Sequence, residues 1–202
     1  MHTERLSADD PGDVRRAAEL LGAGALVAFP TETVYGLGAR ADDPAAMAEL
    51  VRLKRRPQGK EFPRLVPDPP AARACGRFDA VAEALADAFW PGPLTIVVPA
   101  RDGGEVGLRC PDCEVARRML SLVGAVVAAP SANVSGEPPA LSAPAVLAAF
   151  DGRIAAVLDG GPARIGGASA VVRVRGGRLE MLRQGAVARA DLEQVLRKRA
   201  LL

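Results

Sequence analysis

The sequence predicts an α/β protein in which a twisted mixed β-sheet is flanked by helices. Two observations indicate this class. Short apolar runs alternate with segments of helical periodicity, and two adjacent strands around Gly176-Gly177 have the pattern of a hairpin. A hairpin requires an antiparallel pair, whereas alternation favours parallel neighbours, so the sheet must be mixed. With 202 residues, 49% of them apolar, the chain can bury one substantial core, and we expect a single domain over residues 1–202.

Helices are expected where apolar residues recur at helical spacing between capping residues. Asp13–Leu21 has this spacing and ends at Gly22. Asp43 followed by Pro44 is a helix N-cap with proline at the first helical position, and the helix that it opens must close before Pro57. Further helices are expected at Ala80–Phe89, Val115–Leu122, Ala143–Phe150 and Ala190–Arg199.

Strands are expected where short apolar runs, many of them rich in β-branched residues, lie between turn residues. The first of them, Ala25–Phe29, directly follows the first helix. The others are Thr95–Pro99, Val106–Arg109, Ala125–Ala128, Ala155–Leu158, Ala170–Val174 and Leu179–Leu182. Binding sites of α/β proteins gather where strands end, so the segments after these strands are the first place to look for function.

Composition excludes several classes of function. His2 is the only histidine and lies in a terminus expected to fray. This excludes catalysis by a serine–histidine or cysteine–histidine pair and zinc sites with histidine ligands. A net charge of +2 and 3% aromatic residues argue against recruitment of nucleic acid by the overall field or by base stacking. The remaining mechanisms work by positioning and charge stabilisation, as nucleotidyl transfer does.

Neither a membrane segment nor a metal centre is expected. The apolar runs are too short to cross a bilayer and Met1–Asp10 has no signal-peptide core, so we expect a cytoplasmic protein. Cys110-Pro-Asp-Cys113 has CxxC spacing but lacks a second ligand pair. We therefore expect reduced surface thiols there and name no metal ligand.

Hydroxyl groups follow the first predicted strand. Thr31, Thr33 and Tyr35 lie together in Phe29-Pro-Thr-Glu-Thr-Val-Tyr-Gly-Leu-Gly38, although the chain has only four threonines and one tyrosine. They fit either a binding site at a strand end or a polar turn whose hydroxyls cap backbone groups.

Basic residues gather between Arg52 and Lys60, where five cations fall within nine residues. They fit either a phosphate clamp or cations that stabilise a helix C-terminus. Because Pro57 disfavours helical dihedrals in the residue before it, we expect the helix to unravel around Lys54–Arg56 into an extended segment. Lys54 and Arg56 would then face one way and Arg55 the other.

A third polar cluster follows the predicted strand Ala125–Ala128. If Ala128–Gly136 is extended, Ser131, Asn133 and Ser135 point the same way and can hydrogen-bond phosphate or ribose. A plain turn would use only some of them. Neither a GxxxxGK[ST] phosphate loop nor a dinucleotide-binding glycine pattern is present, so any nucleotide site is of another type.

In this order, these segments resemble the YrdC-like threonylcarbamoyl-AMP synthase family. The resemblance covers about residues 10–190, looks like the short, single-domain form and implies a YrdC-like fold with an open basic cavity. The matching segments are Pro30–Gly38, Lys54–Pro57, Trp90–Thr95, Leu108–Pro111, Ala129–Gly136, Asp159–Val172 and Leu182–Ala186.

The resemblance implies a nucleotidyltransferase that makes threonylcarbamoyl-AMP and pyrophosphate from L-threonine, bicarbonate and ATP, for modification of adenosine 37 of tRNA. Mg²⁺ would enter with ATP, and a transfer-enzyme complex acting on tRNA and weak direct RNA binding are further expectations. By motif, the catalytic cations would be Lys54 and Arg56, and the ATP contacts would be Arg56, Lys60, Ser131, Asn133, Ser135 and Arg183. Threonine would be held by Thr33, Arg109, the backbone at Ala129 and Ser169.

Arg109 also fits this role physically, because a carboxylate in an apolar pocket favours a planar, bidentate partner. Trp90 is expected to be a packing anchor rather than a catalytic group.

Several positions depart from the family pattern. Glu61-Phe62-Pro63 replaces the usual continuation of the basic motif, Cys113 stands in place of a histidine, Pro139 replaces a serine, and Ala168 and Ala170 flank Ser169 in place of an acid and a hydroxyl. These changes leave open whether the pocket prefers threonine.

Two alternatives remain open at this stage. One is a noncatalytic module that binds structured or double-stranded RNA by shape, which steep salt dependence without pyrophosphate release would favour. The other is a related carbamoyl-adenylate enzyme with a different acceptor, as in hydrogenase-maturation carbamoyltransferases, which turnover with carbamoyl phosphate would favour.

Overall fold

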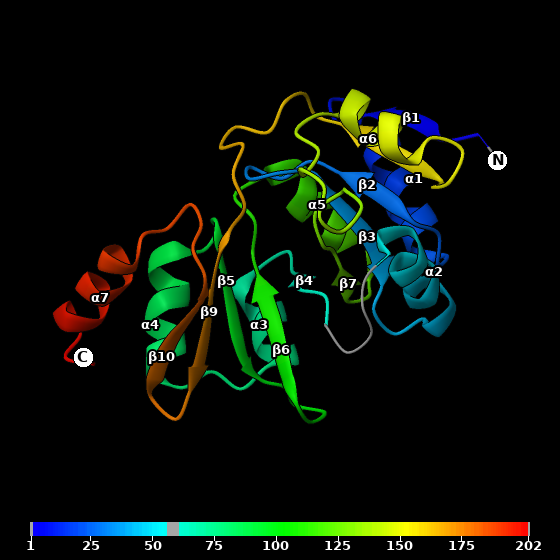
Figure 1. Cartoon of the computed structure of the whole chain (residues 1–202). Coiled ribbons are helices and arrows are strands. Elements are labelled where there is room, and N and C mark those ends of the chain that lie inside the picture. The colour runs from blue at the N-terminus through cyan, green and yellow to red at the C-terminus, as the bar shows by residue number, and fades with distance from the viewer. Residues whose placement is uncertain (1, 56–60, 202) are drawn as a thin grey trace.

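The computed structural model describes residues 2–55 and 61–201. In this part of the chain, ten strands form a sheet in the order β1-β8-β2-β3-β7-β4-β6-β5-β9-β10 (Figure 1). Four neighbouring pairs are parallel (β1/β8, β2/β8, β4/β6 and β5/β9), and the other five are antiparallel. The mixed sheet that the sequence predicts is therefore confirmed.

The elements have the following bounds. The strands are β1 (Glu4–Ser7), β2 (Val27–Phe29), β3 (Gly36–Arg40), β4 (Arg64–Leu65), β5 (Leu94–Pro99), β6 (Glu105–Arg109), β7 (Val127–Ala128), β8 (Ala156–Asp159), β9 (Ala170–Arg175) and β10 (Arg178–Arg183). The helices are α1 (Pro11–Gly22), α2 (Pro44–Lys54), α3 (Pro69–Cys75), α4 (Ala80–Phe89), α5 (Glu114–Val123), α6 (Ala143–Phe150) and α7 (Arg189–Lys198).

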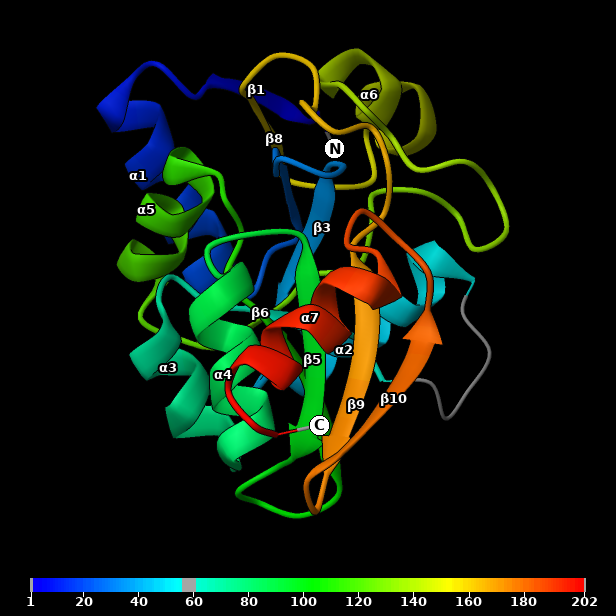
Figure 2. The ribbon, with the colours of Figure 1, turned by 90° about the vertical axis from the view of Figure 1, so that its left-hand side faces the viewer.

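The helices cover the two halves of the sheet differently. In the half that contains β1, β8, β2 and β3, one apolar cluster joins α1 and α5 to the sheet and a second joins α2 and α6 to it. In the other half, α4 and α7 pack over β5, β6 and β9, and Figure 2 shows both helices on the viewer's side of β5 and β9. Among the described residues, no helix has the length and apolar character that crossing a membrane requires.

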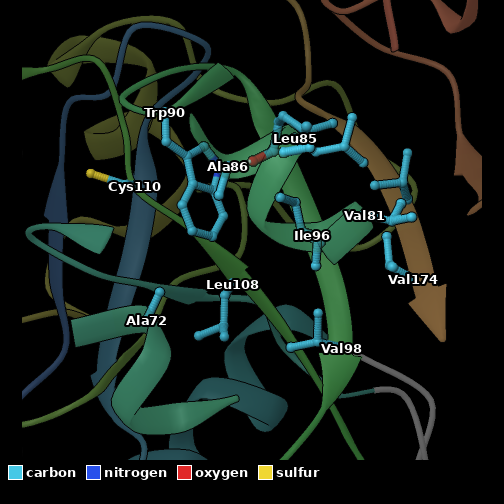
Figure 3. Packing of buried hydrophobic residues seen from close by; sticks show 14 of the residues in the cluster. Ala72, Val81, Leu85, Ala86, Trp90, Ile96, Val98, Leu108, Cys110 and Val174 are labelled. Atoms are coloured by element: carbon cyan, nitrogen blue, oxygen red, sulfur yellow. Dashed lines mark hydrogen bonds between the residues drawn. The ribbon is translucent and has the colours of Figure 1, made fainter. Parts of the chain in front are cut away.

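Trp90 is a packing anchor, as the sequence predicts. Its side chain lies in the cluster with Ile96 and Leu108 (Figure 3), and its indole Nε1 donates a hydrogen bond to the Leu94 carbonyl at 2.6 Å. Its ring meets the Phe78 ring edge-on, with 5.9 Å between centroids.

The prediction of an extended segment at Lys54–Arg56 is wrong for the part that the structure describes. Helix α2 continues through Lys54, and Arg55 ends it in the left-handed conformation, with φ 47° and ψ 41°. Proline restricts only the residue directly before it, which is Arg56, so the helix persists to Lys54. Arg55 is exposed, as expected, whereas Arg56 and Lys60 lie outside the described residues.

Four elements were not expected from the sequence. Strand β3 is unusual because Gly36 and Gly38 lie in it, and the ring of Phe29 passes so close that a Cβ at Gly38 would be 2.9 Å from it. Strands β1 and β4 are short, and α3 begins with two prolines that resemble a loop. Each was missed because local patterning does not show which neighbour the segment meets.

Candidate functional site

The open face of β5, β6, β9 and β10 forms the floor of a cavity of about 1070 Å³. Successive side chains of a strand point to opposite faces, so Thr95 and Val97 line this cavity while Ile96 and Val98 pack under the helices. The same alternation places Glu105, Gly107, Arg109, Val171 and Arg173 on the floor. The walls come from Thr31 and segments 33–36, 61–63 and 129–131, with Lys54, Pro139 and Ala168.

A β-bulge turns Arg183 into this cavity. Met181 pairs with Val172 on the helix side of the sheet, but Arg183 rather than Leu182 pairs with Val171 on the cavity side. In a regular ladder Leu182 would take that place and Arg183 would point under the helices. The extra residue therefore places a cation in the cavity and leaves Leu182 41% exposed at its edge.

Ser169 links this cation to the floor. Its carbonyl accepts hydrogen bonds from Arg183 Nη2 and Nε at 2.9 and 3.2 Å, and its hydroxyl lies 2.9 Å from Thr95 Oγ1. A Cβ at Gly185 would lie 2.3 Å from the backbone nitrogen of Ala170, so only glycine allows the chain after β10 to pack here. The glycine of the C-terminal motif thus fixes the segment that carries Ser169.

Arg109 lines the cavity and has one nitrogen without a hydrogen-bond partner among the described residues. Its Nε donates to the Gly92 carbonyl at 3.1 Å and its Nη2 to Glu32 Oε2 at 2.7 Å, with only 7% of the arginine side chain exposed. No hydrogen bond among the described residues uses Nη1, and Nη1 is not among their fully enclosed unpaired atoms. Arg109 is therefore held in place with donor capacity left over for a ligand carboxylate.

Thr33 lines the cavity near this arginine and is itself fully buried. Thr31 Oγ1 donates to the Val34 carbonyl at 2.6 Å, which uses its only hydrogen. The 2.8 Å bond between the two hydroxyls must then be donated by Thr33, whose remaining lone pairs can accept a hydrogen bond from an ammonium or hydroxyl group. The four residues expected to hold threonine (Thr33, Arg109, Ala129 and Ser169) all line the cavity.

Lys54 joins helix α2 to the loop after β7. Its side chain is buried, and Nζ donates to the Ser131 carbonyl at 2.6 Å, the Asn133 carbonyl at 2.7 Å and Asn133 Oδ1 at 3.1 Å. The Lys54 carbonyl accepts from the backbone of Ser135 at 2.9 Å. Lys54 lines the cavity and at the same time organises one of its walls.

The expected row of Ser131, Asn133 and Ser135 is not formed. The backbone turns, with Asn133 N bonded to the Ser131 carbonyl at 3.0 Å, because the Asn133 amide also bonds the carbonyls of Val134 and Glu137. Ser131 lines the cavity and donates its hydroxyl hydrogen to Asn133 Oδ1 at 2.6 Å, whereas Asn133 and Ser135 do not line it.

Tyr35 pins a distant loop to the cavity wall. Its hydroxyl donates to the Gly161 carbonyl at 2.7 Å and accepts from the Gly160 nitrogen at 3.2 Å. Burial raises the pKa of the Tyr35 phenol to about 12, so the group is a neutral donor at physiological pH. The loop that precedes Ser169 is thereby tied to the segment that carries Thr33.

Cys110 is not on the surface as expected, whereas Cys113 is partly exposed. All three have free thiols, and Cys110 is fully buried, with Sγ 3.4 Å from the Pro67 carbonyl. Burial raises the pKa of the Cys110 thiol to about 11 and also raises that of Cys113. The strand ladder encloses Cys110 because it follows β6 directly and packs against Trp90.

Sequence reasoning missed three polar residues of the site. Glu32 forms an ion pair with Arg109, but it lies in a motif of which only the threonines and the tyrosine were considered. Glu105 and Arg173 form an ion pair on the cavity floor at 3.0 Å. The alternation of Glu105, Gly107 and Arg109 with apolar residues could have indicated the open face.

Fold and cavity together define an α/β protein with a large cavity lined by arginines, hydroxyl groups and apolar side chains. A sequence model of the Sua5/YciO/YrdC family, described as "Telomere recombination", matches residues 19–185. The chain belongs to this family.

Similar proteins carry a consistent name. The threonylcarbamoyl-AMP synthase of Bacillus subtilis (strain 168) is 36% identical over 205 residues, covering 96% of this chain and 59% of that protein. The threonylcarbamoyl-AMP synthase of Pyrococcus abyssi is 38% identical over 202 residues, covering 91% and 57%. The crystal structure of P. abyssi Sua5 complexed with L-threonine matches with a TM-score of 0.91 at 34% identity, covering 97% of this chain and 61% of that one. The chain thus spans less than two thirds of the length of these relatives.

Proposed function

We propose that this chain is a threonylcarbamoyl-AMP synthase, which converts L-threonine, bicarbonate and ATP into threonylcarbamoyl-AMP and pyrophosphate. The observation that carries the proposal is Arg109, a buried arginine that lines the cavity with Thr33 and Ser169 and whose Nη1 has no hydrogen-bond partner among the described residues. The names of the relatives and a neighbour's bound L-threonine support the same substrate. A subsite formed by a buried arginine and hydroxyl groups suits a small molecule better than an RNA helix, which proteins read by shape at their surface.

The cavity offers a separate position for each reactant. Arg109 would hold the threonine carboxylate, and Thr33 would accept a hydrogen bond from the amine or the hydroxyl. The amine and carbon dioxide from bicarbonate form a carbamate with loss of a proton, and a carbamate oxygen then attacks the α-phosphorus of ATP, with the P–O bond to pyrophosphate breaking. The protein's part is to position these groups and offset their charge.

ATP would bind at the cations and hydroxyl groups of the cavity. Arg183 and Ser131 both line the cavity, and Ser131 can turn its hydroxyl from Asn133 toward a phosphate while Lys54 still holds the Asn133 amide oxygen. Arg56 and Lys60 would complete the clamp, although both lie outside the described residues. Lys54 would add positive charge and hold the loop in place.

Mg²⁺ would arrive with ATP. No group of three acidic, histidine or cysteine side chains that could hold a metal occurs within residues 2–55 and 61–201. Of the acidic residues that line the cavity, Glu105 is already paired with Arg173. The triphosphate and water would therefore supply most of the metal's ligands.

Product analysis tests the proposal directly. The protein is incubated with ATP, bicarbonate and each amino acid, and the products are identified by mass spectrometry. We expect threonylcarbamoyl-AMP and pyrophosphate only when threonine and bicarbonate are both present. Equal pyrophosphate release after carbon dioxide has been scrubbed would refute this chemistry, and turnover with carbamoyl phosphate in place of both substrates would indicate a different acceptor.

The proposal also includes the use of threonylcarbamoyl-AMP to modify tRNA. Threonylcarbamoyl-AMP is an activated carbonyl donor, and we expect it to be consumed at adenosine 37 of tRNA when a transfer enzyme is added. Measuring modified tRNA with and without that enzyme tests this step. Formation of the product without any transfer to tRNA would restrict the proposal to the synthase reaction.

Adjacent arginines provide a matched pair of variants. Arg55 is exposed, so Arg55→Ala should change kcat/KM less than about threefold. Arg56→Ala should lower it by about 10- to 150-fold, since a hydrogen bond to a charged group contributes roughly 1.5–3 kcal/mol. Arg56→Lys should recover only part of this loss, because a lysine ammonium is a point charge and cannot form the paired hydrogen bonds of a planar guanidinium. Equal losses in the two alanine variants would mean that the cluster acts only as a general electrostatic patch.

A further inference from the structure

Glu32 and Arg109 form a buried ion pair behind the cavity. Only 1% of the Glu32 side chain and 7% of the Arg109 side chain are exposed, and Oε2 lies 2.7 Å from Nη2. A buried pair of this kind has a large desolvation cost and is weak evidence for a stabilising role. Its geometry indicates another use, because Glu32 contacts the arginine that faces the cavity and does not itself line the cavity.

Glu32 fixes the direction of the guanidinium. Arg109 Nε is held by the Gly92 carbonyl and Nη2 by Glu32, so the plane of the guanidinium is defined by two bonds at 3.1 and 2.7 Å. The backbone of Glu32 is itself held, since its carbonyl accepts from Ile165 N at 2.7 Å. These bonds leave Nη1 as the guanidinium nitrogen without a hydrogen-bond partner among the described residues.

Glu32 also balances the charge of Arg109. Among the described residues, Glu32 Oε1 is the one buried side-chain oxygen or nitrogen atom without a hydrogen-bond partner, so no second donor offsets this carboxylate. The pair is therefore close to neutral as a unit. A ligand that brings only a negative charge gains less from a neutral pair than from a lone cation, whereas a zwitterion brings its own balancing ammonium.

We propose that Glu32 is a positioning residue that aims Arg109 and, by neutralising it, makes the subsite prefer a zwitterionic amino acid to a simple carboxylate anion. This inference rests on the proposed function in that it takes the cavity to bind threonine. It assigns the discrimination to Glu32, which acts through Arg109 without touching the ligand.

Two variants separate the two parts of the proposal. Glu32→Gln keeps the shape and an oxygen for Nη2 but removes the charge, whereas Glu32→Asp keeps the charge but shortens the reach. Glu19→Gln, an exposed position on α1, is the matched control. Calorimetry measures the Kd of L-threonine and of 3-hydroxybutyrate, which is threonine without its amino group.

For Glu32→Gln we expect the preference for threonine over 3-hydroxybutyrate to fall by about tenfold or more, mainly through tighter binding of the anion. For Glu32→Asp we expect both ligands to bind more weakly, with their ratio preserved. An unchanged ratio in Glu32→Gln refutes the charge-balance part, and unchanged affinities in Glu32→Asp refute the positioning part.

The outcomes also separate this inference from the proposed function. A purely structural role would lower the thermal stability of both variants without moving the affinity ratio, and thermal unfolding of each variant is measured alongside. If the wild type binds amino acids but releases no pyrophosphate, the proposed function fails. The ratio of the Kd values for a bound amino acid and its deaminated analogue then still decides the role of Glu32. If the wild type binds no amino acid, the Arg109 subsite is wrong and both inferences fail.

Discussion

Replacing Lys54 by methionine tests whether a buried lysine holds the cavity wall together. The ammonium donates three hydrogen bonds of 2.6, 2.7 and 3.1 Å to oxygens of Ser131 and Asn133. Hydrogen bonds to charged groups contribute about 1.5–3 kcal/mol each, but methionine retains the apolar contacts and the ammonium's own desolvation cost disappears. We therefore expect a net loss of about 3 kcal/mol in the free energy of unfolding, or roughly 6–12 °C in Tm for a chain of this size.

Urea and thermal unfolding measure this loss, and the chain contains its own control. Lys198 is an exposed lysine in the last turn of α7, and Lys198→Met should stay within about 0.5 kcal/mol of wild type. The kcat/KM for ATP should fall in Lys54→Met and not in Lys198→Met, because Ser131 lines the cavity. If the two variants unfold alike, Lys54 does not organise this loop and the hydrogen bonds to it carry no net free energy.

Three further predictions concern packing, ionisation and backbone strain. Gly38→Ala should lower the free energy of unfolding by about 1–3 kcal/mol, because the added Cβ would lie 2.9 Å from the Phe29 ring. Gly36→Ala should lower it less, because there the added Cβ would lie 3.5 Å from the same ring. Equal losses in Tm would contradict this prediction. The pKa of the Cys110 thiol is raised from 9.0 to about 11 in the folded protein, so its contribution to stability is complete below pH 9 and is lost as pH rises to about 11. Urea unfolding across this range should therefore show a steeper decline in the free energy of unfolding for wild type than for Cys110→Ala. Parallel curves would contradict this prediction. Arg55→Gly should raise stability by about 0.5 kcal/mol, since the left-handed φ of 47° favours glycine, and a lower Tm would show that the arginine side chain contributes more than the strain costs.

The sequence predicts regular elements well where periodicity and caps agree. The bounds of α4 and α6 match the expected ranges, and both helices begin at a capping residue, Asp79 and Ser142, whose side chain accepts from the first turn. Strand β3 could not be predicted in this way. Its two glycines weaken any strand pattern, and they are present because Phe29 crosses them, a contact that exists only after β2 and β3 have paired.

The candidate site likewise has residues that the sequence predicts and residues that it does not. The family motifs pointed to Arg109, Thr33 and Ser169, and all three line one cavity although they lie on or beside β6, β2 and β9, which are not neighbours in the sheet. The motifs failed for Asn133, since the side chain of an asparagine can bond its local backbone and turn the chain instead of facing a ligand. An alternating pattern predicts a shared face only where the backbone is extended.

Departures from regular geometry position several of the groups expected to bind substrate. The bulge at Leu182 turns Arg183 to the open face, and the left-handed residue at Arg55 ends α2 at the point where Lys54 reaches the loop after β7. Each departure costs free energy relative to a regular ladder or helix, so surrounding contacts must maintain it. Gly185 against the backbone of Ser169 is one such contact, because removing the bulge would shift the segment that must fit there. Deleting Leu182 would make Arg183 follow Met181 directly, which keeps Arg183 opposite Val171 in a regular ladder, so ATP turnover should persist. Loss of ATP turnover in a deletion variant that stays folded would show that the bulge does more than direct Arg183 into the cavity.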